Sequence, residues 1–275
     1  MDLRCKYSAS LKIAVTGATG YIGARLISLS GANDFAPCQA DQVEPGCALI
    51  HLGAAVAATR DALLQNLAAD TWLLEQTRDG RFSQIIYASG NNVYPLALDC
   101  RPGDSTRCND YYSASKVFGE RLFAEFSAAP TVSVRIADVF GAGQKHGNFF
   151  KAVEQALGAS TALKKYGLGL KRRSYIHVDD LCGMLLHLAR EQYGAVGLQT
   201  VFNACYGDSA TVAEIVDQVA GAAGLPIEQV VLAQDNSAQD VRTMKSVLPQ
   251  RYALRWPTFR DALGAYVQQI IASRR

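Results

Sequence analysis

The sequence predicts an α/β fold in which a doubly wound parallel sheet is joined to a smaller carboxy-terminal lobe. Short apolar runs rich in β-branched residues alternate with stretches of helical periodicity between Leu11 and Arg190 of the 275-residue chain. The first run ends in a glycine-rich turn that leads directly into a helix. After Gly141 the elements become shorter and less regular, which predicts a separate lobe.

The first elements follow one another closely. Residues 11–15, LKIAV, predict a buried strand, and residues 21–30 predict the helix after the glycine turn. A weaker strand, FAPCQA, spans residues 35–40. Residues 47–53, CALIHLG, have the pattern of a strand buried on both faces, and an amphipathic helix follows over residues 60–78.

The same alternation continues through the middle of the chain. SQIIYAS at residues 83–89 predicts an interior strand, and residues 111–127 predict the helix that follows it. TVSVRIA at residues 131–137 predicts another interior strand. SYIHV at residues 174–178 leads into a helix over residues 179–190. Strand and helix in strict succession favour parallel pairing.

Composition and charge exclude several classes of protein. The chain has 27 basic and 25 acidic residues, a net charge of +2, and no long run of one sign. We therefore expect neither a nucleic-acid groove nor a membrane-binding patch. The longest apolar stretch, ALIHLGAAVAA, is too short to span a bilayer, and the start, MDLRCKYSAS, lacks the apolar segment of a signal peptide.

The cysteines and histidines point to a reducing compartment and to no metal site. Seven cysteines without a C-x-x-C pair are typical of reduced thiols in a cytoplasmic protein. The four histidines show no metal-ligand spacing.

The glycine turn has the spacing of a dinucleotide-binding loop. VTGATGYIG places Gly17, Gly20 and Gly23 between the first strand and its helix. Glycines permit the tight turn, the close approach of a pyrophosphate and the packing of helix on strand, and the helix amino terminus offers free N–H groups. The turn predicts a Rossmann-like cofactor site.

Asp41 follows the weak strand at residues 35–40, where a dinucleotide site has an acidic residue for the ribose. No arginine lies beside it to receive a 2′-phosphate, so NAD is favoured over NADP. The alternative is that Asp41 is only a turn residue before VEPG.

The predicted division of the chain follows from these elements. One further helix is expected at residues 211–224 and another at residues 258–273. The predicted parts are a tail at residues 1–10, an NAD-binding Rossmann-like part at residues 11–140 with residues 174–204 returning to it, and a substrate-binding lobe at residues 141–173 and 205–275.

YYSASK at residues 111–116 contains a candidate reactive pair. Tyr112 and Lys116 are four residues apart and share one face of the predicted helix. An ammonium beside a phenol favours the phenolate, so we expect Lys116 to lower the pKa of Tyr112 from its usual value of about 10. The alternative is a solvated polar patch in the first turn of a helix.

With both motifs in one chain, the sequence resembles the extended short-chain dehydrogenase/reductase superfamily, and within it the NAD-dependent epimerase/dehydratase family. IHLGAA resembles the segment whose small residues line the cofactor, and QNLAADTWLLE resembles the helix whose asparagine, here Asn66, supports the active site. RIADVFGAG, RRSYIHVDD, FNACYGDSATVAEI and LRWPTF are similar to later segments of the family.

The resemblance implies roles for individual residues. Tyr112 would be the general acid/base, and Lys116 would bind the nicotinamide ribose and hold down the tyrosine pKa. Ser89 is the implied hydroxyl of the site. The residues implied to bind the cofactor are Gly17, Thr19, Gly20, Tyr21, Ile22, Gly23, Asp41, Gly53, Ala54, Asn66 and Lys116. Those implied to bind the substrate are Asn91, Asp138, Asn148 and Arg173.

The chain departs from the family pattern after the strand at residues 83–89. When YASGNNVYP is aligned on its Val-Tyr pair, Gly90 takes the place of the family's serine or threonine, and Ser89 is one residue early. Three explanations remain open: Ser89 reaches in through a bent strand end, a neighbouring amide substitutes, or the site is crippled. Asn91 and Asn92 replace the Asp-Glu pair of sugar 4,6-dehydratases and cannot exchange protons as it does, which argues against that mechanism.

Two substrate-side residues give conflicting signals. Asp138 stands where the family commonly has an asparagine near the substrate diphosphate, and a carboxylate repels phosphate unless it is paired. Arg173 matches a family arginine that binds the diphosphate. The alternative for Arg173 is a surface charge in a basic run.

We therefore expect an NAD-dependent epimerase or reductase that acts on a secondary hydroxyl or carbonyl of a sugar-like substrate, with nucleotide sugars among the candidates. The resemblance also suggests a homodimer through the helices around Asn66 and Tyr112. The alternative is a catalytically weakened family member that serves as a nucleotide-binding or scaffold subunit, which Gly90 and the short segment between Gly23 and His51 motivate.

Overall fold

The computed structural model describes residues 12–30, 35–37, 45–78, 80–144, 149–191, 193–194, 196–246 and 255–273. Two compact units make up the chain, and each is described by itself. The first unit comprises Met1–Ala88, Phe118–Ser133 and Cys182–Thr200. The second comprises Ser89–Val117, Val134–Leu181 and Val201–Arg275.

A six-stranded sheet has the order β2-β1-β3-β4-β5-β9. Strand β1 pairs in parallel with both β2 and β3, and β3 pairs in parallel with β4. Successive strands therefore run outward from β1 in both directions, which confirms the predicted doubly wound sheet. The strand bounds are β1 (Ile13–Thr16), β2 (Phe35–Pro37), β3 (Cys47–His51), β4 (Phe82–Gly90), β5 (Thr131–Ile136) and β9 (Thr200–Ala204).

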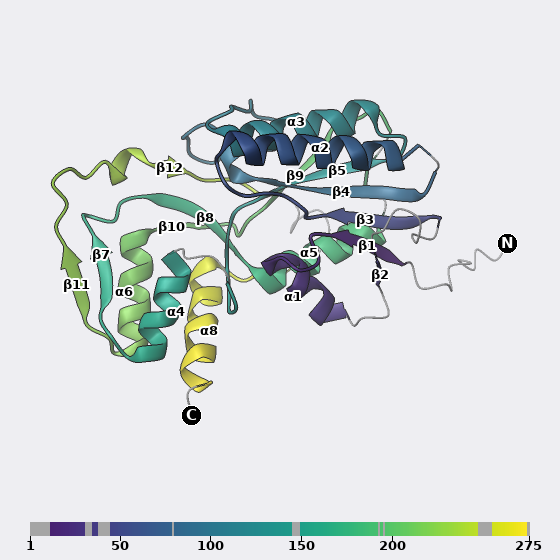
Figure 1. Ribbon diagram of the computed structural model, residues 1–275. Helices are drawn as coiled ribbons and strands as arrows, with labels where there is room; N and C mark the ends of the chain where they lie inside the picture. The colour runs from purple at the N-terminus through teal and green to yellow at the C-terminus, as the bar shows by residue number, and fades with distance from the viewer. Residues whose placement is uncertain are drawn as a thin grey trace. The chain divides into compact units, whose positions relative to one another are not determined.

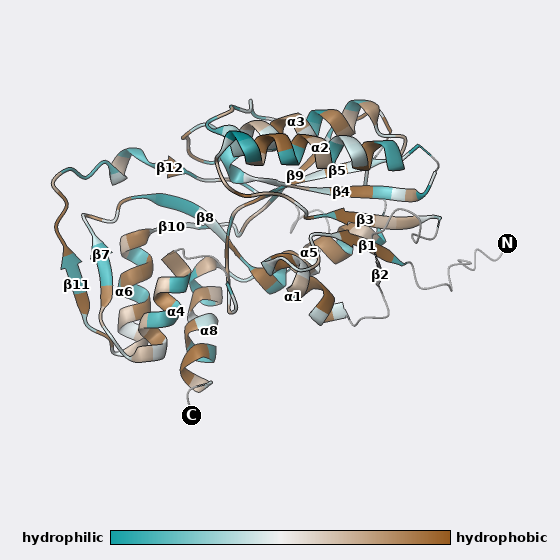
Figure 2. Ribbon diagram, viewed as in Figure 1, coloured by the Kyte–Doolittle hydropathy of each residue, from teal (hydrophilic) through white to brown (hydrophobic). Residues whose placement is uncertain are grey.

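Helices cover both faces of the strands in the first unit. Figure 1 shows α1 (Tyr21–Ser30) and α5 (Val178–Arg190) on one face and α2 (Arg60–Gln76) with α3 (Tyr111–Phe126) on the other. Figure 2 shows strands β1 and β3 as strongly apolar, because both of their faces are covered. The core between the strands and the second pair of helices contains Ala14, Cys47, Leu49, Leu73, Leu74, Phe82, Ile85, Tyr87, Phe123 and Ala129.

The second unit is built around β8 (Arg172–His177), which pairs with β10 (Ser209–Thr211), β12 (Val241–Arg242) and β6 (Asp138–Phe140). A separate parallel ribbon joins β7 (Leu163–Tyr166) to β11 (Ile227–Val230). Helices α4 (Phe149–Ala159), α6 (Val212–Ala223) and α8 (Phe259–Ala272) lie together beside this ribbon (Figure 1).

An aromatic cluster forms the core of the second unit. The ring of Phe140 lies 5.1 Å from that of Phe150, 5.4 Å from that of Phe259 and 5.7 Å from that of Tyr266, measured between centroids. These contacts join β6 to α4 and α8. The rings of the last two pairs are arranged edge to face, a preferred geometry for aromatic pairs.

The strands and helices predicted before Ala137 are confirmed, whereas several later elements were missed. Helix α1 has the predicted bounds, whereas α2 ends at Gln76 because Thr77 caps it. Helix α4 and strands β6, β7, β9, β10, β11 and β12 were not predicted. None of the described helices is long and apolar enough to cross a membrane. No group of three potential metal-ligating side chains occurs within the described ranges.

Candidate functional site

The glycine turn of the first unit leaves no room for a side chain at Gly17 or Gly23. Gly17 has a φ of 69°, and a Cβ there would lie 2.8 Å from the amide nitrogen of Gly53. A Cβ on Gly23 would lie 2.3 Å from the carbonyl oxygen of Gly17. The Gly20 amide donates to that same oxygen at 3.0 Å. Gly17, Thr19 and Gly20 are exposed, so the turn offers an open cradle of the kind that a pyrophosphate requires.

A second wall of this site follows β3. The Gly53 amide donates to Thr16 Oγ1 at 3.0 Å. Asn66 fixes the next residues, because its Oδ1 accepts from the Ala55 amide at 2.8 Å and its Nδ2 donates to the Ala55 carbonyl at 3.0 Å. A pocket of about 310 Å³ is lined by Thr16, His51, Gly53, Ala54, Ala55, Gln65, Asn66, Ala69, Trp72 and Leu73. Three predicted cofactor residues, Gly53, Ala54 and Asn66, therefore lie together.

A buried polar network that the sequence reading missed supports this wall. His51 Nε2 lies 2.9 Å from Asp70 Oδ1, and Tyr87 donates to Asp70 Oδ2 at 3.0 Å. Since the carboxylate can only accept, His51 donates through Nε2 and accepts the Thr16 hydroxyl proton through Nδ1, at 2.5 Å. The Thr16 hydroxyl oxygen is thereby oriented to accept the hydrogen bond from the Gly53 amide. Asp70 lies one helical turn after Asn66, a spacing that could have revealed the network.

The second unit contains the predicted Tyr112/Lys116 pair. Asp110 caps α3, since its Oδ1 accepts from the Ser113 amide at 2.6 Å. Lys116 Nζ lies 5.8 Å from the centroid of the Tyr112 ring. Lys116 is 3% exposed and Tyr112 is partly buried, whereas Tyr111 is half-exposed. The helical spacing therefore brings the two side chains together as expected.

The prediction that Tyr112 has a lowered pKa is wrong. Burial raises the pKa of Tyr112 to about 12, and the charge of Asp110 raises it further in the same direction. Burial disfavours the phenolate because the charged form loses its hydration. The free protein therefore holds Tyr112 as a proton donor at neutral pH.

Asp110→Asn should lower the pKa of Tyr112. The substitution removes the negative charge that opposes phenolate formation, while asparagine still caps the helix. The alkaline pH dependence of Tyr112 ionisation, measured by ultraviolet absorbance against Tyr112→Phe, should move to lower pH. Asp104→Asn, in the same loop, should leave it unchanged; an unchanged titration in Asp110→Asn would contradict the assignment.

Asp138 is paired, which removes part of the conflict seen in the sequence. Asn91 Nδ2 donates to Asp138 Oδ1 at 2.8 Å. Both residues are partly buried, at the end of β4 and the start of β6. The amide takes one of the carboxylate's acceptor positions.

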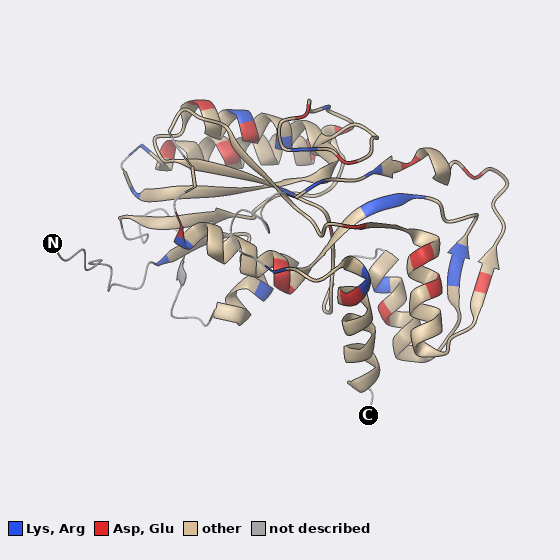
Figure 3. Cartoon of the chain, turned by 180° about the vertical axis from the view of Figure 1, so that it is seen from behind, with Lys and Arg blue, Asp and Glu red and all other residues tan. Residues whose placement is uncertain are grey.

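Arg173 is held by an acidic partner. It is 6% exposed, and its Nη1 donates to the Asp240 carbonyl at 2.7 Å while Nη2 pairs with the Asp240 carboxylate. Arg242 stands opposite Arg173 in the pairing of β12 with β8, and its buried Nε has no hydrogen-bond partner among the described residues. Burial and the charge of Arg173 lower the pKa of Arg242. Figure 3 shows this basic stretch along β8 and β12.

Asp240 is the counter-charge of this cluster. Burial alone would raise its pKa, but the hydrogen bond and charge of Arg173 and the charge of Lys171 lower it overall. Arg242 was missed in the sequence, since β12 is only two residues long.

Arg173→Ala should weaken UDP binding by about 2 kcal/mol if this guanidinium contacts a diphosphate. Asp240→Asn is the matched variant, because it removes the same ion pair and leaves the guanidinium. Calorimetry with UDP should show a loss in the first variant and none in the second, although both should melt at lower temperature. Equal affinities in Arg173→Ala and wild type would leave Arg173 with a structural role only.

The remaining predicted residues are placed as follows. Ser89 is 3% exposed, and its Oγ has no hydrogen-bond partner within the described part of the chain. Gly90 is extended, with φ −144° and ψ 164°, so Ser89 and Gly90 face opposite sides of β4 and the strand end is not bent.

Tyr21 and Ile22 begin α1 and are partly buried. Asp41 and Asn148 lie outside the described residues.

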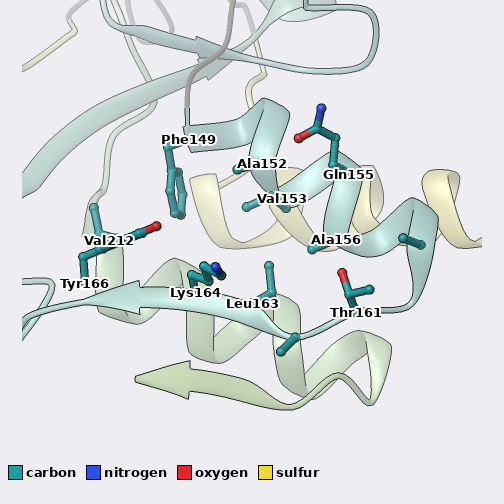
Figure 4. A pocket seen from close by; sticks show the side chains of 12 residues that line it. Phe149, Ala152, Val153, Gln155, Ala156, Thr161, Leu163, Lys164, Tyr166 and Val212 are labelled. Atoms are coloured by element: carbon teal, nitrogen blue, oxygen red, sulfur yellow. The ribbon is translucent and has the colours of Figure 1, made fainter. Parts of the chain in front are cut away.

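An apolar pocket of about 600 Å³ lies in the second unit between α4 and β7. Figure 4 shows side chains of α4 facing those of β7 across it. Its lining residues are Phe149, Ala152, Val153, Gln155, Ala156, Ala159, Thr161, Ala162, Leu163, Lys164, Tyr166 and Val212.

The NAD dependent epimerase/dehydratase family matches residues 33–205, more than half of the chain. The chain belongs to this family. Membership confirms the resemblance seen in the sequence and supports NAD as the cofactor.

Individual relatives agree with this assignment. The low-salt glycan biosynthesis protein Agl12 of Haloferax volcanii is 25% identical over 236 residues, which are 83% of this chain and 74% of that protein. MoeE5 in complex with UDP-glucose and NAD has a TM-score of 0.79 at 21% identity, covering 96% of this chain and all of the other (100%). UDP-N-acetylglucosamine 4-epimerase from Bacillus cereus has a TM-score of 0.79 at 16% identity, covering 96% of each chain. The two structures confirm the fold class.

Proposed function

We propose that this chain is an NAD-dependent epimerase or reductase that acts on a secondary hydroxyl or carbonyl of a nucleotide-linked sugar. The observation that carries the proposal is the Tyr112/Lys116 face of α3, with the phenol kept protonated and the ammonium beside it. A positioned phenol that gives and takes a proton suits a reaction between an alcohol and a ketone.

The residues of the first unit fit NAD. The turn at Gly17, Gly20 and Gly23 would hold the pyrophosphate, and Gly53 and Ala54 would line the dinucleotide. Asn66 would support this wall by holding Ala55 through two hydrogen bonds. When bound, NAD supplies the nicotinamide that accepts or returns hydride.

The protein's own groups would handle the proton and the substrate. Tyr112 would exchange a proton with the reacting oxygen, and Lys116 would bind the nicotinamide ribose and stabilise the phenolate while it exists. Asn91 and Asp138, joined by a hydrogen bond, would receive sugar hydroxyls. Ser89 stays a predicted catalytic residue, and its hydroxyl has no hydrogen-bond partner among the residues that the structure describes.

Two features favour a nucleotide-linked sugar. The pocket between α4 and β7 presents Phe149 and Tyr166 in a mostly apolar wall, which suits the flat face of a base. Arg173 and Arg242 place two guanidinium groups near each other, which suits a diphosphate. MoeE5, which has the same fold, is bound to UDP-glucose and NAD in its solved structure.

A sugar 4,6-dehydratase reaction is not proposed, although the dTDP-glucose 4,6-dehydratase DesIV from Streptomyces venezuelae has the same fold, with a TM-score of 0.75. Asn91 and Asn92 carry amides that do not act as acid and base in the neutral pH range.

A homodimer is also proposed, through α2 and the later part of α3. Leu64, Trp72 and Phe118 are large apolar side chains on these helices that are between 43% and 50% exposed. Apolar side chains of this size on a helix surface favour contact with a second copy.

A panel of nucleotide sugars tests the proposed function. Wild-type protein is incubated with NAD or NADH and each of UDP-glucose, UDP-N-acetylglucosamine and dTDP-glucose, and products are identified by nuclear magnetic resonance. With NAD, a new epimer or an oxidised keto sugar is expected with wild type and not with Tyr112→Phe, and NADH alone should give no product because these sugars carry no ring ketone. The weakened-subunit alternative, which Gly90 motivates, predicts binding of a nucleotide without any product.

A further inference from the structure

A buried carboxylate lies in the core of the first unit. Asp70 is 2% exposed and is one of the buried residues of α2. His51 donates to its Oδ1 at 2.9 Å, and Tyr87 donates to its Oδ2 at 3.0 Å. Burying a carboxylate costs free energy even when hydrogen bonds satisfy it, so its presence here points to a role beyond packing.

The carboxylate fixes which nitrogen of His51 carries the proton. A carboxylate only accepts, so the proton of a neutral imidazole lies on Nε2, and Nδ1 is left as the acceptor. The ring packs against Tyr87 and Phe123, with centroids 5.6 and 6.0 Å away, and this packing holds its orientation. Nδ1 is the only acceptor that the Thr16 hydroxyl reaches among the described residues, at 2.5 Å.

This chain of hydrogen bonds ends at the wall of the dinucleotide site. The Gly53 amide donates to Thr16 Oγ1 at 3.0 Å. One helical turn before the carboxylate, Asn66 holds Ala55 through two hydrogen bonds. Helix α2 therefore holds both ends of residues 53–55, at one end directly and at the other through two intermediate side chains. All three residues of this wall line the pocket of about 310 Å³.

The second oxygen of Asp70 leads away from the wall. Tyr87 donates to this oxygen, and Gly119 of α3 leaves the space for it, since a Cβ on Gly119 would lie 2.5 Å from Asp70 Oδ2. The carboxylate thus has one branch that reaches the wall, through His51, and one that joins only core elements. The two branches can be cut separately.

We propose that Asp70 is a positioning residue for NAD binding. It fixes the tautomer of His51, and that tautomer orients Thr16 to hold the Gly53 amide. With the other tautomer, the Thr16 hydroxyl proton would lose its acceptor and the hydroxyl would turn. The inference rests on the proposed function, because it places NAD along this wall.

Asp70→Asn and Tyr87→Phe are the matched variants, compared by calorimetry with NAD. Asparagine keeps the size of the side chain, but its amide presents either oxygen or NH₂ to His51, so the tautomer is no longer fixed. NAD affinity should fall about fivefold, the worth of one hydrogen bond. Tyr87→Phe also removes a hydrogen bond from Asp70 but leaves the carboxylate facing His51. It should melt at lower temperature and bind NAD as wild type does.

Nitrogen nuclear magnetic resonance reads the tautomer directly, at a pH where imidazole is neutral. The chain has four histidines, so His51 is assigned from the signals missing in His51→Gln. A ring protonated only at Nε2 is expected in wild type and Tyr87→Phe, and a mixture of tautomers in Asp70→Asn.

Thr16 supplies a second pair of variants, at the other end of the chain of hydrogen bonds. Thr16→Val keeps the shape of the side chain without its hydroxyl and should weaken NAD binding at least as much as Asp70→Asn. Thr16→Ser keeps the hydroxyl and should bind NAD nearly as well as wild type.

The outcomes separate this inference from the proposed function. If wild type binds no NAD, both are overturned. If Asp70→Asn binds NAD as well as wild type does, the inference fails and the proposed function stands. Equal losses in Asp70→Asn and Tyr87→Phe would give Asp70 a structural role only and also overturn the inference. Equal NAD affinities in Thr16→Val and Thr16→Ser would overturn it even if Asp70→Asn failed to fold. Loss in Asp70→Asn alone, with mixed tautomers, supports it.

Discussion

Turnover should fall by about a hundredfold or more when Tyr112 is replaced by phenylalanine. The ring and the helix remain, and the only group removed is the hydroxyl whose pKa burial raises to about 12. The loss should appear in kcat with little change in NAD affinity, because the phenol acts on the reacting oxygen. Steady-state kinetics with the sugar that gives a product, together with calorimetry for NAD, measure both quantities.

Two neighbouring substitutions serve as controls. Tyr111→Phe should have little effect, since Tyr111 is half-exposed and has serine, not lysine, four residues later. Lys116→Ala should reduce both turnover and NAD affinity, because the Lys116 ammonium would contact both the Tyr112 phenol and the nicotinamide ribose. Full activity in Tyr112→Phe would eliminate the proposed mechanism.

NAD binding should be lost when Gly20 is replaced by valine. Gly20 is exposed in the turn, and a Cβ there meets only the Gly17 carbonyl oxygen, at 3.1 Å, so the protein should still fold. The added branches would stand where the pyrophosphate must approach the backbone. Calorimetry should detect no NAD binding, while the circular dichroism spectrum stays that of the wild type.

Gly221→Val is the matched control for this prediction. A Cβ at Gly221, in α6, meets nothing within 4 Å, so its NAD affinity should equal that of wild type. Gly23→Val should be more damaging than either, because its Cβ would lie 2.3 Å from a backbone oxygen. NAD affinity unchanged in Gly20→Val would mean that the turn does not hold the cofactor.

The parts of the fold that the sequence predicted depend on local spacing. The glycine turn, α1 and α3 are each recognisable from the spacing of neighbouring residues along the chain. The four-residue step from Tyr112 to Lys116 is enough to put both side chains on one helix face. Long apolar runs such as Cys47–His51 are likewise recognisable without knowing their neighbours.

The parts that were missed depend on contacts between distant segments. Strand β12 contains two residues, yet it brings Arg242 opposite Arg173, which lies far earlier in the chain. The raised pKa of Tyr112 comes from burial, which spacing along a helix does not reveal.

Hydride transfer from the sugar is tested most directly with an isotope. Wild-type protein and NAD are mixed with the reactive nucleotide sugar, carrying either hydrogen or deuterium at the carbon that bears the reacting hydroxyl. The near-ultraviolet absorbance of reduced nicotinamide should appear with wild type, more slowly with deuterium, and be absent with Tyr112→Phe. Product formed at the same rate with either isotope, and without reduced nicotinamide at any time, would contradict the proposed reaction.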